Sequence, residues 1–337
     1  MCKKPYPSKE TNIKSLIVKT LVSAVALSAS LLVNAQTYPE KTVTVIVPFA
    51  AGGPTDTVAR LIAQSMGNTL KQQLIIENVG GAGGTIGAAR AAKAAPDGYT
   101  LFLHHIGQST APALYRKLSY DAVNSFEPIG LITDVPMLLV AREDFPAKDL
   151  KELLAYVKTN KDKVTYANAG LGSASHLCGM LFMTAIETDL TTVPYKGTGP
   201  AMNDLLGKQV DLMCDQSTNT SSQIKSGKIK AYGVTTKTRV GSLPTIPTMN
   251  EAGLPGFEVA VWHGLYAPKG TPKPVIDALS KALKIALKDP TVKQRFEDLG
   301  TEPVAENRAT PEALQAHLKA EIDKWSPIIK KAGVYAD

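Results

Sequence analysis

Apolar runs alternate with amphipathic stretches along most of the chain, from residue 42 to residue 236. The apolar runs are short and are bounded by Gly, Pro, Asn or Asp, so they predict strands. The stretches between them repeat apolar positions every three or four residues, which predicts helices. We expect strands at 42–49, 73–79, 99–105, 126–142, 164–169, 190–195, 210–215 and 229–236. We expect helices at 56–70, 84–95, 149–160, 175–186, 199–209 and 219–227.

The pattern changes near the C-terminus, where the chain from Pro272 onward has only the helical repeat. Helices are expected at 272–289, 290–300 and 310–333, and Thr310 is a natural N-cap for the last of them. The alternation before residue 236 predicts an α/β fold in which helices cover mainly parallel sheets. The extended run 127–142 is long for one strand and lies between two α/β blocks, so it is a candidate for a crossing between two domains.

The first 35 residues have the pattern of an export signal. Five lysines precede or flank an apolar stretch of 14 residues, Thr20–Val33, and small residues follow at Val33–Ala35. The stretch is too short to span a bilayer, so we expect cleavage after about Ala35 and a periplasmic protein that is not membrane-embedded. A retained membrane anchor is the alternative.

The charge balance argues against a nucleic-acid partner. Residues 1–35 carry five Lys and one Glu, so their removal lowers the formal net charge from +7 to +3. The remaining basic residues are scattered over predicted helix faces and form no continuous basic footprint.

Two cysteines, Cys178 and Cys214, remain after the signal. Cys178 lies in a predicted helix and Cys214 at the end of a predicted strand, so we expect a disulfide between them in an exported protein. Two buried free thiols are the alternative. No histidines stand at metal-ligand spacing from these cysteines, so we expect no metal site and no cofactor.

Three glycine-rich turns each follow a predicted strand and lead into a predicted helix. They lie at 50–57, 80–90 and 168–177. In open α/β sheets ligands bind at the carboxyl ends of strands, where helix N-termini offer free N–H groups and a partial positive charge. Thr55, Ser173 and Ser175 add hydroxyl donors. The three turns together indicate a site for a carboxylate or a phosphate.

Other site chemistries fit less well. Gly81, Gly83 and Gly87 resemble part of a dinucleotide fingerprint, but the next strand does not end in the acidic residue that such a site needs. No P-loop and no G-x-S-x-G motif occurs. His176 beside Ser173 and Ser175 is more typical of helix capping than of a catalytic pair. We therefore do not expect an enzyme.

Five motifs together resemble the Bug family of periplasmic solute-binding receptors of the tripartite tricarboxylate transporter type. They are YPEKTVTVIVPFAAGGPTDTVAR, ENVGGAGGTIGAARAAKAAPDGYTL, GSASHL, VPYKGTGPAMNDLLGKQVDLM and LPTIPTMNEAGLPGFEV. The resemblance covers the chain from Tyr38 to about Val334. It implies a type II, two-domain clamp of the Venus-flytrap kind. Domain one would combine 36–138 with 262–337, domain two would be 139–261, and a second crossing would lie at 257–268.

The resemblance also implies which residues hold the ligand. The first loop would contribute Phe49, Ala51, Gly52, Thr55 and Asp56, and the second Gly83, Gly84 and Thr85. The third would contribute Asn168, Gly170, Gly172, Ser173 and His176. Further candidates are Gln108, Lys196 and Asp215.

The function implied is capture of a small carboxylate, such as a di- or tricarboxylate or an aromatic acid, for delivery to membrane transporter subunits. One carboxylate would sit on the stretch 44–60, and a dicarboxylate would bridge the two domains. The alternative is an orphan receptor that presents its ligand to a membrane sensor kinase. We expect a monomer.

Overall fold

The computed structural model describes residues 1–3, 38–333 and 335–336, and the described residues from Pro39 onward belong to one compact unit. The predicted export signal and its cleavage site lie outside the described residues. In the described part of the chain, no helix combines the length and the apolar character that a membrane span requires.

In the described residues nine strands form one sheet with the order β2-β1-β3-β9-β4-β7-β5-β6, and β8 pairs with β4 on the edge opposite β7. Their bounds are β1 Val43–Val47, β2 Leu74–Asn78, β3 Thr100–His105, β4 Phe126–Arg142, β5 Thr165–Asn168, β6 Thr191–Pro194, β7 Leu212–Gln216, β8 Ile229–Val234 and β9 Ala260–Pro268. All eight strands expected from the apolar pattern are therefore present, and β9 occupies the predicted second crossing.

The helices are those expected, with one addition. Their bounds are α2 Pro54–Leu70, α3 Thr85–Ala92, α4 Gly107–Leu114, α5 Leu150–Asn160, α6 Ala174–Ala185, α7 Thr198–Leu206, α8 Ser217–Lys225, α9 Lys273–Lys288, α10 Pro290–Asp298 and α11 Pro311–Ala332. Helix α4 was not predicted, because it is short, has Pro112 inside and follows the strand β3 almost directly.

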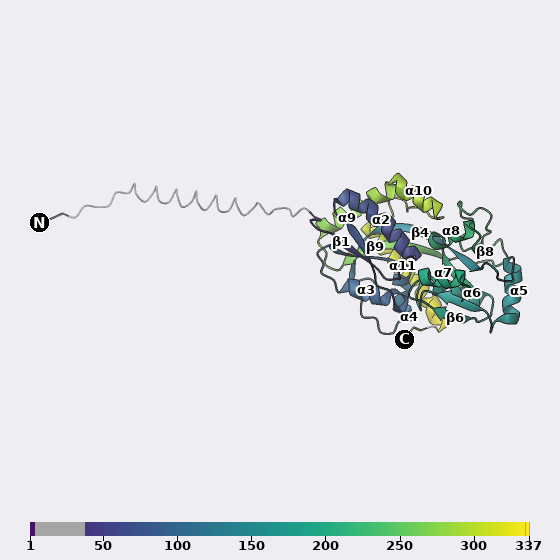
Figure 1. Ribbon diagram of the computed structural model, residues 1–337. Coiled ribbons are helices and arrows are strands. Elements are labelled where there is room, and N and C mark those ends of the chain that lie inside the picture. The colour runs from purple at the N-terminus through teal and green to yellow at the C-terminus, as the bar shows by residue number, and fades with distance from the viewer. Residues whose placement is uncertain (4–37, 334, 337) are drawn as a thin grey trace. The chain divides into compact units, whose positions relative to one another are not determined.

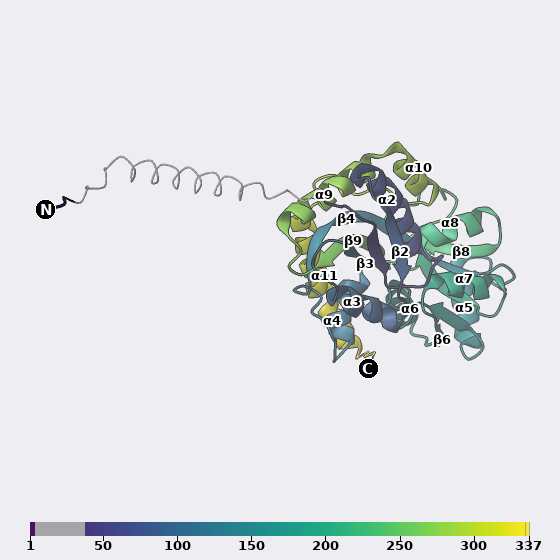
Figure 2. The ribbon, with the colours of Figure 1, turned by 60° about the vertical axis from the view of Figure 1, so that its left-hand side comes forward.

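The long strand β4 joins two halves of the sheet. Its residues 126–136 pair with β9, whereas residues 137–142 pair with β7 and β8, and all of these pairs are antiparallel. On one side of this junction β2, β1 and β3 run parallel, and on the other side β6, β5 and β7 run parallel. Figures 1 and 2 show α2, α3 and α9 around the first group of strands and α5 to α8 around the second.

The parallel strands of the two halves place the functional loops at the junction between the halves. A parallel pair needs a crossover helix, so β1 leads into α2, β5 into α6 and β7 into α8. The strands β1, β3, β4, β7 and β9 are largely buried, as in sheets covered by helices, whereas the edge strands β2 and β6 are partly exposed. The β5–β7 group runs opposite to the β1–β3 group and meets a different length of β4, so the carboxyl ends of the two groups face each other across the junction. The starts of these helices gather there.

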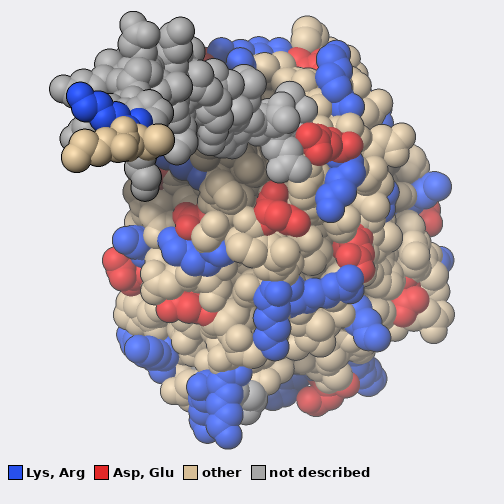
Figure 3. Space-filling view, turned by 90° about the vertical axis from the view of Figure 1, so that its left-hand side faces the viewer, with Lys and Arg blue, Asp and Glu red and all other residues tan. Residues whose placement is uncertain are grey.

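Charge is distributed without a single dominant sign. On the face shown in Figure 3, basic and acidic side chains are interspersed. Most ion pairs of the described residues join partly exposed side chains, such as Lys273 with Asp277 and Lys288 with Glu306. Pairs of this kind contribute little to stability, so they serve mainly solubility.

Candidate functional site

A small buried cavity lies where the two halves of the sheet face each other. Its volume is about 20 Å³, which is enough for little more than one water molecule. It is lined by Phe49, Gly53, Pro54, Thr55, His105, Ala169, Ser173, Ala174, Ser175, Thr198, Asp215 and Gln216. These residues come from both sides of the junction at β4, so the cavity belongs to neither half alone.

Four helices begin at this cavity. Pro54 and Thr55 open α2, Ala174 and Ser175 open α6, Thr198 opens α7, and Gln216 directly precedes α8. The first N–H groups of a helix lack intrahelical partners, and each N-terminus carries a partial positive charge. Convergence of four such ends creates a positive potential without a basic side chain, which suits a bound anion.

Hydroxyl groups complete the lining. The N-cap Ser173 accepts a hydrogen bond from the His176 N–H at 3.2 Å, and its hydroxyl lies 3.1 Å from that of Ser175. Thr55 is buried, with its hydroxyl oxygen 3.5 Å from Nε2 of His263. Hydroxyls can reorient to donate to an oxygen atom, so they add to the donor capacity of the helix starts.

The histidines near the cavity are neutral. Phe49 stacks on His105 with ring centroids 4.7 Å apart, and Nδ1 of His105 accepts a hydrogen bond from the Gly107 N–H at 3.0 Å. Burial, aided by the nearby rings of His104 and His263, holds the pKa of His105 well below its usual value. Burial likewise lowers the pKa of His263 to about 4. Neither ring supplies a positive charge at neutral pH.

Asp215 is the one acidic residue among the cavity-lining residues. Its carboxylate accepts a hydrogen bond from the Asn219 amide at 2.6 Å, and the Gln216 N–H and the Thr198 hydroxyl also bind it. Burial raises the pKa of this carboxyl to about 6, although the three hydrogen bonds act in the opposite direction. No ion pair to Asp215 occurs in the described part of the chain.

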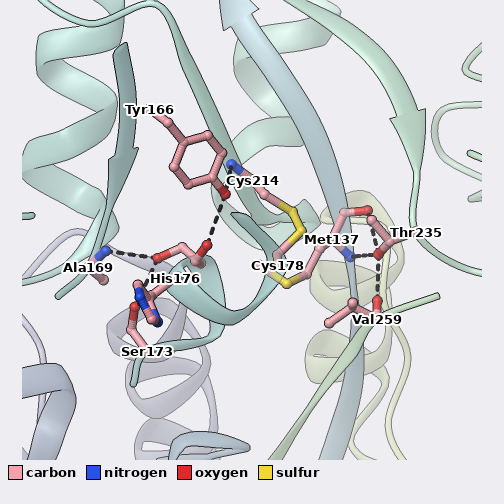
Figure 4. Close-up of a disulfide and its surroundings, with 10 residues drawn as sticks. Met137, Tyr166, Ala169, Ser173, His176, Cys178, Cys214, Thr235 and Val259 are labelled. Atoms are coloured by element: carbon pink, nitrogen blue, oxygen red, sulfur yellow. Dashed lines mark hydrogen bonds between the residues drawn. A yellow bond between two sulfur atoms is a disulfide. The ribbon is translucent and has the colours of Figure 1, made fainter. Parts of the chain in front are cut away.

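A disulfide fixes one wall of the cavity. Cys178 of α6 is joined to Cys214 of β7, which confirms the expected disulfide. Figure 4 shows Tyr166 beside this bridge. Its hydroxyl donates to the Ser175 carbonyl at 2.9 Å and accepts from the Cys214 N–H at 3.0 Å. The start of α6 and the end of β7 are thus held together by one covalent bond and two hydrogen bonds.

The structure brings four of the sequence-predicted site residues to the cavity, namely Phe49, Thr55, Ser173 and Asp215. The others do not line it. Asp56 accepts hydrogen bonds from Gly52, Arg60 and Asn78. Gln108 is buried and its amide donates to the Ala122 carbonyl. The remaining predicted residues that do not line the cavity are Ala51, Gly52, Gly83, Gly84, Thr85, Asn168, Gly170, Gly172, His176 and Lys196.

Two of these residues, Lys196 and Gly83, take part in main-chain contacts between the halves. The Ala50 N–H donates to the Lys196 carbonyl at 2.9 Å, while the Lys196 side chain is exposed. Gly83 has φ +59°, and a Cβ there would overlap the Leu171 carbonyl oxygen. The Tyr115 hydroxyl lies 2.7 Å from the Ala82 carbonyl and 2.8 Å from that of Leu171. The loops therefore meet through main chain, and glycine is what allows this approach.

Sequence reasoning missed His105, Thr198 and Gln216. His105 and Gln216 lie at strand ends without the clustered glycines that marked the other loops, whereas Thr198 stands between Gly197 and Gly199 at a helix start. A signal for Thr198 and Gln216 was present, since each stands where a predicted strand gives way to a predicted helix.

A much larger hollow lies elsewhere on the molecule. A groove of about 920 Å³ borders α8, α9, α10 and the loops at 236–242 and 300–306. Long side chains of both charges line it, including Lys225, Lys288 and Glu297, and it contains none of the predicted ligand residues. Its size reflects an open surface rather than a built binding site.

The two sheet halves, the crossing strands and the helix starts at a shared cavity define an α/β periplasmic binding protein fold. The chain belongs to the tripartite tricarboxylate transporter receptor family (TctC), whose model matches residues 58–334. This confirms the resemblance seen in the motifs. The members are transporter receptors, which bind solutes and are not enzymes.

Solved structures agree with this assignment. The periplasmic binding protein BugD is 58% identical with a TM-score of 0.87, over 88% of this chain and 99% of that chain. MatC from Rhodopseudomonas palustris, with bound malate, is 45% identical with a TM-score of 0.84, over 87% and 100%. A second R. palustris protein, with adipate, is 34% identical with a TM-score of 0.83, over 88% and 99%.

Proposed function

We propose that this protein captures a small carboxylate in the cavity between the two halves and delivers it to the membrane subunits of a tripartite tricarboxylate-type transporter. It would act in the periplasm, after removal of the signal at about Ala35. The observation that carries the proposal is the meeting of four helix N-termini at one buried cavity. The malate and adipate bound by two relatives support a dicarboxylate as the solute.

Binding would involve closure of two domains, 36–138 with 262–337 and 139–261. Support comes from β4, which changes its pairing partner between Pro136 and Met137. The cavity is too small for a dicarboxylate as it stands, and loops of the two halves are joined by the backbone hydrogen bond from the Ala50 N–H to the Lys196 carbonyl. A solute would enter when these loops part, and its contacts to both halves would favour closure.

Replacing the cavity hydroxyls tests the site. Titration calorimetry with malate, succinate and adipate should show binding of at least one acid to the purified protein. Thr55→Ala and Ser173→Ala should each weaken that binding by about tenfold or more, because each removes a hydrogen bond to a charged group. The exposed residues Thr159 and Ser222 provide matched controls, T159A and S222A. Unchanged affinity in both cavity variants would place the site elsewhere.

Gly83 tests the closure. A methyl group there overlaps Leu171 only when the loops meet, so Gly83→Ala should keep the open form and weaken binding by about a hundredfold. Gly227→Ala is the matched control, since Gly227 also has positive φ but has no atom within 4 Å of an added Cβ. Small-angle scattering should show compaction on ligand addition for the control and none for G83A. Equal compaction in both variants would refute the closure at this loop.

A further inference from the structure

Asp215 is a buried acidic group in a site that is otherwise built for an anion. The carboxylate is 1% exposed and has no basic partner in the described residues. The neighbouring ring on the cavity wall, His105, is neutral because burial lowers its pKa. A buried charge without a counter-charge is costly to keep. Asn219, Thr198 and the Gln216 N–H compensate only in part, since burial still raises the pKa of Asp215 to about 6.

Gln216 adds an unsatisfied hydrogen-bond acceptor beside Asp215. This residue is buried, lines the same cavity and has a side-chain oxygen without a hydrogen-bond partner in the described part of the chain. Both residues come from the end of β7. The β7 wall therefore presents hydrogen-bond acceptors, whereas the starts of α2 and α6 present donors.

A simple dicarboxylate does not complement such a cavity. Its carboxylates match the helix starts, but a chain of CH₂ groups would leave the acceptors of the β7 wall without a donor. It would also place negative charge near Asp215 with nothing between them. A hydroxyl or ammonium group on the carbon beside a carboxylate would donate to these acceptors and reduce the repulsion. A site built around a polar group of the ligand discriminates strongly against analogues that lack it.

We infer that Asp215 is a specificity-determining residue that selects acids bearing a hydroxyl or ammonium donor next to a carboxylate over unsubstituted acids of the same length. The inference rests on the proposed function, because it requires the solute to occupy this cavity. A hydroxyl and an ammonium group can each donate a hydrogen bond, which is what Asp215 requires of the ligand. An ammonium group would additionally neutralise the buried charge.

Matched acids test the inference. Titration calorimetry at pH 7.5, where Asp215 is ionised, would compare succinate with malate and aspartate, and adipate with its 2-hydroxy and 2-amino derivatives. In the unmodified protein, a substituted acid should bind at least tenfold more tightly than the unsubstituted acid of its series. A larger gain for the amino acid would identify charge pairing, and a larger gain for the hydroxy acid would identify hydrogen bonding to the carboxylate.

Asp215→Asn then assigns the discrimination to this residue. The advantage of the substituted acid should fall to less than threefold in D215N and persist in the control D162N, which removes one exposed carboxylate. Unsubstituted acids that bind within threefold of the substituted ones would overturn the inference and leave the proposed function intact. An affinity advantage of the substituted acid that persists in D215N would also overturn the inference and leave the proposed function intact. If no acid of either series binds, the proposed function fails and the inference fails with it.

Discussion

Two aspartates, Asp56 and Asp215, occupy similar places in opposite halves of the molecule. Each lies where a parallel strand gives way to a helix, and they are 4% and 1% exposed. Asp56 accepts hydrogen bonds from Arg60, Asn78 and the Gly52 N–H, while Asp215 has only uncharged donors.

Their surroundings shift the two pKa values in opposite directions. Burial works to raise the pKa of Asp56, but the hydrogen bonds, that from Arg60 foremost, outweigh it and the pKa is lowered. For Asp215 burial prevails, and the pKa rises to about 6. Asp56 is therefore a structural group that shapes the first loop, whereas Asp215 is held at a cost to stability beside the cavity. The role of an acidic residue near a binding site thus depends on its hydrogen-bond partners rather than on its position in the fold.

The disulfide next to Asp215 should have the largest effect on stability, and it has no counterpart near Asp56. Replacing Cys178 and Cys214 together with Ala should lower the free energy of unfolding by about 4 kcal/mol, since the bridge closes a loop of 36 residues. Urea unfolding measures this loss. The same loss should follow when the unmodified protein is reduced, whereas reductant should leave the double variant unchanged. Equal stability with and without the bridge would contradict the prediction.

Asp215→Asn should raise stability at neutral pH. The unfolded carboxyl has a pKa near 3.8 and the folded one about 6, so between these values the folded protein binds more protons. The unmodified protein therefore loses stability as the pH rises from about 4 to about 6, by about 3 kcal/mol at 1.36 kcal/mol for each pKa unit.

The ligand-free D215N variant lacks this loss, so its stability advantage should grow from near zero below pH 4 to about 3 kcal/mol at pH 7. Urea unfolding of both proteins across this range measures the difference. If the free energy of unfolding of the two proteins changed with pH in the same way, ionised Asp215 would not destabilise the folded protein.

Asp56→Asn should have the opposite effect and lower the free energy of unfolding by about 2 kcal/mol at pH 7. The new amide group would point a donor at the donors of Gly52, Arg60 or Asn78, so buried hydrogen bonds are lost. The depressed pKa of Asp56 makes its contribution present at neutral pH and lost as the pH falls below the usual range of aspartate. Unfolding at pH 7 and pH 3 tests both points. A variant as stable as the unmodified protein at pH 7 would remove the contrast with Asp215.

Arg60→Ala should have the smallest effect and lower the free energy of unfolding by about 0.5 kcal/mol. The Arg60 side chain is 55% exposed, so water and salt screen its ion pair with Asp56. The Gly52 and Asn78 donors remain in R60A. A loss as large as that of D56N would mean that the ion pair, and not the buried hydrogen bonds, holds Asp56.

The sequence pattern predicted the order of elements well because it depends on local periodicity. It also placed Thr55 and Ser173 at helix starts, and the structure brings both to the cavity. The same pattern could not distinguish Asp56 from Asp215, because their pKa shifts depend on partners such as Asn78 and Asn219 and on burial by the other half of the molecule.

Other features depend on contacts that no local pattern records. Lys196 stood out in sequence for its charge, yet the structure uses its backbone carbonyl. His105 reaches the cavity because β9 lies beside β3 and pairs His105 with His263, which are far apart in sequence. The residues of a predicted loop that line the cavity are therefore determined by contacts with the other half of the molecule.

The position of β9 has a consequence for how the chain acquires its structure during synthesis. This strand lies between β3 and β4, yet it begins only at Ala260. A nascent chain that has produced β4 must therefore keep two hydrophobic strand edges unpaired until residue 268 is available. Exposed edges of this kind pair readily with other chains. A ribosome-bound or truncated chain ending before β9 should thus depend on a chaperone, and the completion of β9 marks the point after which aggregation is no longer favoured.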